Sequence, residues 1–92
     1  MIYLDNAATT MIKPLAVSRA VMKAMQTMAS PGRGGHEPAM RAAKTVFDCR
    51  MEAAELFHVP SPEQVVFTLN ATHGLNLAIH SLIKPGSVVL IS

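Results

Sequence analysis

Seven residues in the second half of the chain have the composition of a turn that opens a helix: Thr68-Leu69-Asn70-Ala71-Thr72-His73-Gly74. Asn70 is of the type that caps helix N-termini. The first backbone N–H groups of a helix have no acceptor within it and carry a partial positive charge. Such a helix start can bind a phosphate, and the Thr72 hydroxyl could reach the same anion. On spacing alone, simple capping by Asn70 is the favoured interpretation, since the glycine patterns of the usual nucleotide loops are absent.

The other reactive side chains stand in less specific surroundings. Arg33 and His36 belong to a glycine-rich segment, residues 32–36, which could bind an anion but is also typical of a solvent-exposed loop. Cys49 lies among helix formers, where we expect a buried and unreactive thiol. The histidines have no cysteine or carboxylate partners at metal-ligand spacing, so we expect no metal site. These histidines are His36, His58, His73 and His80.

Three helices are expected to position these residues. Apolar side chains at helical spacing predict a first helix over residues 14–29 and a second over about 38–57, each with a proline in its first turn. A third helix follows Asn70. The residues expected on their buried faces are Val17, Val21, Ala24, Met25 and Met28 in the first, Met40, Ala43, Phe47, Met51 and Ala54 in the second, and Leu75, Ala78, Ile79 and Leu82 in the third.

Two short segments rich in β-branched residues, 64–68 and 87–91, predict strands on either side of the third helix. The second is apolar enough to be covered on both faces. The expected order is therefore two helices and then a β–α–β unit, an α/β arrangement. Because the sequence ends directly after a strand of the buried type, we expect a truncated domain, with residues 1–13 as an N-terminal arm and 14–92 as the first portion of a larger domain.

Composition narrows the class of protein. Hydrophobic residues make up 50% of the chain and charged residues 15%, which excludes a disordered tail. The net charge is only +2 and the basic residues are scattered, so we expect no nucleic-acid partner. A single cysteine cannot form an internal disulfide, the longest apolar run is too short to span a membrane, and no signal peptide is evident. We therefore expect a soluble, cytoplasmic protein without a membrane partner.

Three motifs, in order along residues 2–92, together resemble the start of a known family. They are Ile2-Tyr3-Leu4-Asp5-Asn6-Ala7-Ala8-Thr9-Thr10 with Lys13-Pro14, Pro31-Gly32-Arg33-Gly34-Gly35-His36, and Val66-Phe67-Thr68-Leu69-Asn70-Ala71-Thr72 with Leu75-Asn76-Leu77-Ala78. They are similar to class V aminotransferases of the cysteine desulfurase type. The resemblance implies the large domain of a fold-type I transferase that depends on pyridoxal 5'-phosphate. It also implies a homodimer that converts L-cysteine to L-alanine and passes sulfur through an enzyme-bound persulfide.

The resemblance also implies roles for individual residues. The backbone and hydroxyl that hold the cofactor's phosphate are matched by Ala71 and Thr72. The segment that passes near the substrate pocket is matched by Asn6, Ala7 and Ala8. The loop that approaches the active site of the partner subunit is matched by Arg33 and His36. No catalytic residue of the family is matched: its Schiff-base lysine, its aspartate, its ring-stacking histidine and its cysteine all lie beyond Ser92.

Two other functions stay open. Selenocysteine lyase, epimerase or another class V enzyme would share these motifs. A free-standing helical module could instead bind a partner helix through Met22, Met25 and Met28. For the isolated chain we expect either self-association or pairing of its two strands in an arrangement foreign to the family, because each strand would otherwise expose unpaired edges.

The lysines yield a first prediction. Lys13, Lys23, Lys44 and Lys84 match no covalent cofactor site. After incubation with pyridoxal phosphate and borohydride, mass spectrometry of the 92-residue chain should therefore find only scattered, substoichiometric lysine labelling. Stoichiometric labelling of one lysine would show that the chain has a covalent site of its own.

Overall fold

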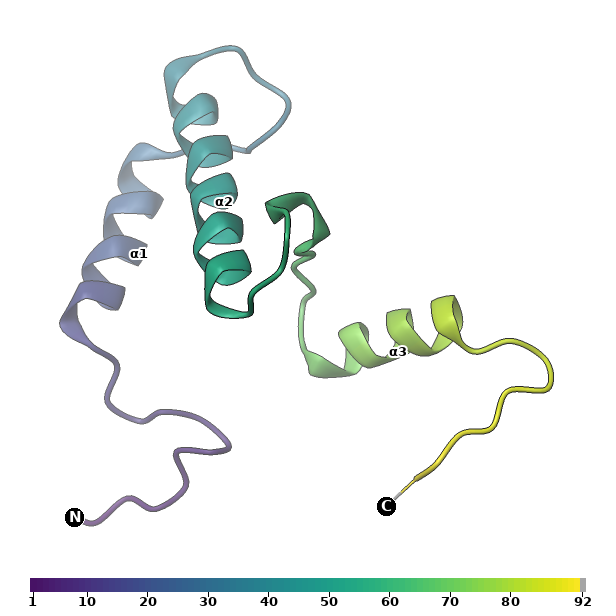
Figure 1. Ribbon diagram of the computed structural model, residues 1–92. Coiled ribbons are helices and arrows are strands. Elements are labelled where there is room, and N and C mark those ends of the chain that lie inside the picture. Colours follow the sequence, from purple (N-terminus) through teal and green to yellow (C-terminus); the bar gives the residue numbers. More distant parts are fainter. Residues whose placement is uncertain (92) are drawn as a thin grey trace.

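The computed structural model describes residues 1–91, and within them the regular structure is helical (Figure 1). In chain order the elements are α1 (Leu15–Thr27), α2 (Glu37–Leu56), the short 3₁₀ helix η1 (Pro62–Gln64) and α3 (Ala71–Leu82). Helices α1 and α2 run in opposite directions as a hairpin, and α3 lies apart from this pair, at the lower right of Figure 1. The three helices predicted from the sequence are confirmed to within about two residues at their ends.

Local signals set the helix ends. Pro14 precedes the first residue of α1, where its missing N–H costs no hydrogen bond. Helix α2 has both Glu37 and Pro38 in its first turn, and the carboxylate there is favoured by the helix dipole. It ends before His58, which adopts a left-handed φ of 54°. These signals act within a few residues, so they do not depend on how the helices pack.

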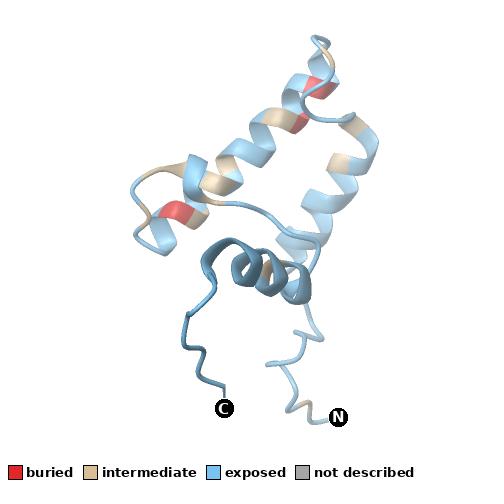
Figure 2. Ribbon diagram, turned by 90° about the vertical axis from the view of Figure 1, so that its right-hand side faces the viewer, coloured by how far each residue is buried: buried red, intermediate tan, exposed pale blue. Residues whose placement is uncertain are grey.

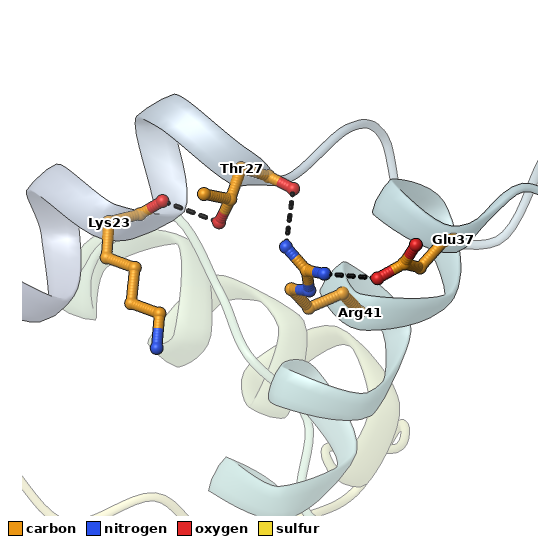
Figure 3. Close-up of polar contacts among 4 residues, drawn as sticks. All are labelled: Lys23, Thr27, Glu37 and Arg41. Carbon is orange, nitrogen blue, oxygen red and sulfur yellow. Dashed lines mark hydrogen bonds and ion pairs between the residues drawn. The ribbon is translucent and has the colours of Figure 1, made fainter.

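Arg41 joins the two arms of the hairpin (Figure 3). Its guanidinium donates to the carbonyl oxygen of Thr27 at 3.4 Å and pairs with the carboxylate of Glu37 one turn earlier. The N–H of Ala29 also donates to the carbonyl oxygen of Pro38 at 3.3 Å. A cation beside the last carbonyls of α1 is favourable for its dipole. Because the Arg41–Glu37 pair faces solvent, it adds only about 0–1 kcal/mol to the stability.

The two predicted strands are not formed. Residues 62–64 make η1 instead, residues 65–68 and 87–91 are irregular, and no β-strand occurs anywhere in residues 1–91. The predicted β–α–β unit is therefore not observed, nor is the alternative in which the two segments pair with each other. The physical reason is that a strand is defined by hydrogen bonds to a neighbouring strand, and neither segment has such a neighbour here. Val88 and Leu90 are accordingly 89% and 93% exposed.

The predicted buried faces are also largely wrong. Within the described part of the chain, the buried apolar residues are Ala39, Ala42 and Ala54, all on α2 (red in Figure 2). Of these, only Ala54 was on a predicted face. The predicted face residues that are exposed instead are Val17, Val21, Met25, Met40, Phe47, Met51, Leu75, Ala78, Ile79 and Leu82. The helical period is correct, but the chain offers these side chains no apolar surface to pack against.

The molecule is open for its size. Its radius of gyration is 17.6 Å, whereas a compact chain of this length has about 12 Å. Its accessible surface is 8375 Å², whereas a folded monomer of this mass exposes about 5,200 Å². Exposed apolar side chains occur on all three helices as well as in the two terminal segments. Removing such apolar faces from water lowers the free energy.

We expect the isolated chain to self-associate through these faces. Met25→Lys should weaken self-association because Met25 is 79% exposed on α1 and apolar, so the substitution places a charge on an apolar face. Gln26→Lys is the matched control, since it adds the same charge at an exposed polar position of the same helix. Sedimentation velocity over a dilution series measures both effects. A chain that stays monomeric at every concentration would contradict the expectation.

Candidate functional site

The N-terminus of α3 is capped by its own side chains. Asn70 has extended backbone geometry, and its Oδ1 accepts a hydrogen bond from the N–H of His73 at 2.8 Å. In return, Nδ1 of His73 accepts one from the N–H of Leu69 at 3.3 Å. The predicted cap is therefore confirmed, and His73 adds a reciprocal bond like that of a capping box. Together the two bonds fix the direction in which the chain enters the helix.

Ala71 and Thr72 are the first two residues of this helix, and both are exposed. Their N–H groups have no intrahelical partner, because the helix has no carbonyl oxygen one turn before them. The Oδ1 atom of Asn70 accepts from the N–H of His73, so it does not pair with the N–H groups of Ala71 and Thr72. Within residues 1–91, the Thr72 hydroxyl also makes no hydrogen bond, while the Thr72 carbonyl accepts one from Nδ2 of Asn76 at 3.0 Å. The turn thus presents two amides and one hydroxyl, a donor set that suits an anion.

Thr68 and Gly74 set the shape of this turn. The Thr68 hydroxyl donates to the carbonyl oxygen of Asn70 at 3.0 Å. A Cβ atom added to Gly74 would lie 3.3 Å from that same hydroxyl oxygen. Gly74 therefore lets Thr68 approach the first turn of the helix closely. Both residues stand in the turn recognised from the sequence, but their contact depends on three-dimensional geometry that spacing does not reveal.

The segment leading into the turn is tied to α2. The guanidinium carbon of Arg50 lies 5.9 Å from the ring centroid of Phe67, within the range of a cation–π contact. At the start of this segment, the pKa of the Glu63 carboxyl is lowered, first by a hydrogen bond from the Ser61 hydroxyl, then by a backbone hydrogen bond and by the positive charge of Arg50. Helix α2 and η1 are also in direct contact. The segment from η1 to Phe67 therefore lies against α2.

The residues of the N-terminal arm form a separate turn. The N–H groups of Ala8 and Thr9 both donate to the carbonyl oxygen of Asp5, and the Tyr3 hydroxyl donates to the carbonyl oxygen of Thr9 at 2.6 Å. Asn6 lines an open hollow of about 430 Å³ beside this turn. Ala7 is an exposed residue of the turn itself. In Figure 1 the arm lies at the lower left and α3 on the right, so the turn with Asn6, Ala7 and Ala8 is not brought to the start of α3.

Arg33 and His36 lie in the loop between α1 and α2. His36 is the N-cap residue of α2, and its carbonyl oxygen accepts from the N–H groups of Ala39 and Met40. Its ring packs on Gly34, where an added Cβ would lie 2.6 Å from Nε2. Since α2 is 20 residues, about 30 Å, long and its other end contacts η1, this loop is far from the segment that leads to α3. Its position toward a partner subunit stays a prediction.

Cys49 is exposed on α2, so the prediction of a buried thiol is wrong. Across residues 1–91, no three His, Cys, Asp or Glu side chains gather closely enough to hold a metal ion. None of the helices in this range is long and apolar enough to cross a membrane.

Comparison with known proteins gives a consistent result. The class-V aminotransferase family matches residues 2–92. The chain is 37% identical over 82 residues to a probable cysteine desulfurase of Synechocystis sp., covering 88% of this chain and 19% of that protein. It is 37% identical over 83 residues to a probable cysteine desulfurase of Streptomyces coelicolor, covering 89% of this chain and 20% of that protein. It is 36% identical over 89 residues to a cysteine desulfurase of Frankia sp., covering 94% of this chain and 21% of that protein.

No solved structure matches the chain significantly. The chain spans about a fifth of the length of the curated relatives it matches. The match nevertheless runs through all three motifs recognised in the sequence, including the capped turn at the start of α3. The family is one of pyridoxal-phosphate-dependent enzymes with the fold-type I architecture. This chain belongs to the class-V aminotransferase family.

Proposed function

We propose that this chain supplies the N-terminal part of a pyridoxal-phosphate-dependent cysteine desulfurase, and that the start of α3 binds the phosphate of the cofactor. The supporting observation is the state of the first turn of α3, where Asn70 satisfies the N–H of His73 and leaves Ala71 and Thr72 exposed. A dianionic phosphate is stabilised at such a position by both the free amides and the helix dipole.

Each residue of the turn has a distinct part in this proposal. Ala71 has only a methyl side chain, so a phosphate can approach its backbone N–H. Thr72 adds a hydroxyl donor beside its own N–H, and this hydroxyl has no competing partner in the described residues. Thr68 and Gly74, in close contact, hold the turn in shape. When bound, pyridoxal phosphate supplies an electron sink for carbanion chemistry on an amino acid, and these residues hold and orient it.

The substrate, partners and location are part of the same proposal. L-cysteine is the proposed substrate, with L-alanine and enzyme-bound persulfide sulfur as products, because the relatives at 36–37% identity are named cysteine desulfurases or probable cysteine desulfurases. Asn6, Ala7 and Ala8 are assigned near the substrate, and Arg33 and His36 toward the other subunit of a homodimer. Catalytic lysine and cysteine residues would come from outside residues 1–92, and a reducing cytoplasm suits the exposed thiol of Cys49.

Two alternative functions stand beside this proposal. The Met-rich helical module is disfavoured because the family match covers residues 2–92 and because exposed apolar side chains are spread over all three helices. Selenocysteine lyase shares the phosphate turn, so the turn does not discriminate between the two reactions. The ratio of kcat/KM for L-cysteine and L-selenocysteine in the complete enzyme separates them.

The phosphate assignment predicts the effect of Thr72→Ala in the complete enzyme. Loss of a charge-assisted hydrogen bond should weaken pyridoxal phosphate binding by about 1.5–3 kcal/mol, roughly 10- to 150-fold. Thr72→Ser is the matched control, because it keeps the hydroxyl and should bind nearly as well as the parent. The dissociation constant is measured by fluorescence titration of the apoenzyme, with circular dichroism to verify the fold. Equal affinities for Thr72→Ala and the parent would refute the assignment.

A further inference from the structure

Arg50 occupies an unusual position on α2. Its side chain is half-buried, and its Nε lies out of contact with solvent and without a hydrogen-bond partner among residues 1–91. Leaving a buried guanidinium N–H unpaired costs free energy, so the position needs a compensating interaction. The ring of Phe67, 5.9 Å from the guanidinium carbon, provides one. A planar guanidinium can lie over an aromatic ring in a way that an ammonium cannot.

Phe67 stands immediately before the candidate phosphate turn. The next residue, Thr68, donates its hydroxyl to the carbonyl oxygen of Asn70 and packs against Gly74. A displacement of Phe67 would therefore move Thr68 and, through it, the cap of α3. Because η1 also contacts α2, the segment that leads to the turn touches this helix at two places, at η1 and at the Arg50–Phe67 contact.

We infer that Arg50 is a positioning residue for the phosphate turn: it holds Phe67, and through Phe67 it sets where the first turn of α3 lies relative to α2. The inference rests on the proposed function. Arg50 does not touch the cofactor in this scheme. It fixes the segment from which the phosphate donors project, and it thereby reduces the ordering that binding must supply.

The test is a double-mutant cycle in the complete enzyme, with Arg50→Met, Phe67→Leu and the double variant. Each single change should raise the dissociation constant for pyridoxal phosphate about 3- to 30-fold, the range of a partly desolvated cation–π contact. The double variant should bind no more weakly than the weaker single variant, because both remove the same contact. Phe67→Tyr keeps the aromatic ring and should bind the cofactor about as well as the parent enzyme. Arg19→Met, which removes an exposed charge from α1, is the matched control and should leave binding unchanged.

Urea unfolding of the apoenzymes separates positioning from simple stability. If Arg50 positions the turn, the double-mutant cycle should give a coupling energy between Arg50 and Phe67 in the affinity for the cofactor. A coupling energy that appears only in the free energy of unfolding would mean a purely structural role and would overturn the inference. If Arg50→Met does not fold, Phe67→Leu and Phe67→Tyr decide: equal affinities for these two contradict the inference. Thr72→Ala is measured in parallel. If Thr72→Ala weakens cofactor binding while Arg50→Met and Phe67→Leu do not, the inference about Arg50 is wrong and the proposed function stands. If Thr72→Ala has no effect on binding, the proposed phosphate site is wrong, and with it the inference that rests on it.

Discussion

Tertiary structure requires apolar side chains to leave water, and in residues 1–91 the buried apolar side chains are three alanines of α2. Each buries little more than a methyl group, so apolar burial holds the helices together only weakly. The polar contacts that join α1 and α2 lie at one end of the hairpin: Arg41 donates to the carbonyl oxygen of Thr27 (Figure 3), and the N–H of Ala29 donates to that of Pro38. Helix α2 also contacts η1, and Arg50 of α2 lies over the ring of Phe67 in the segment that follows η1. Almost everything else in the arrangement is local.

The candidate site follows from this limit. Its geometry comes from bonds that span at most four residues: Asn70 to His73, Leu69 to His73, and Thr68 to Asn70. Such contacts form whenever α3 forms, whether or not a sheet stands behind it. A helix start that exposes two amides and a hydroxyl is thus encoded in a short stretch of sequence. This explains why the capped turn forms while the predicted strands beside it are absent.

The same division between local and distant contacts decides what the sequence could predict. Pro14, Pro38 and Asn70 mark helix starts that the structure confirms, because capping and proline geometry act within one turn. The buried faces could not be predicted, since a face such as that of α1 is buried only if another surface covers it. The strands failed for the related reason that a ladder needs a neighbouring strand. The contact of Arg50 with Phe67 could not be predicted, because it joins separate parts of the chain and no spacing rule indicates it.

The central claim is that the phosphate of pyridoxal phosphate sits at the start of α3, and a crystal structure of the complete enzyme with the cofactor tests it most directly. Phosphate oxygens should then lie within about 2.7–3.1 Å of the Thr72 hydroxyl and of the backbone nitrogens of Ala71 and Thr72. In that structure, Asn70 should still accept from the N–H of His73. A cofactor whose phosphate is bound elsewhere, with the Ala71 and Thr72 donors facing water, would contradict it.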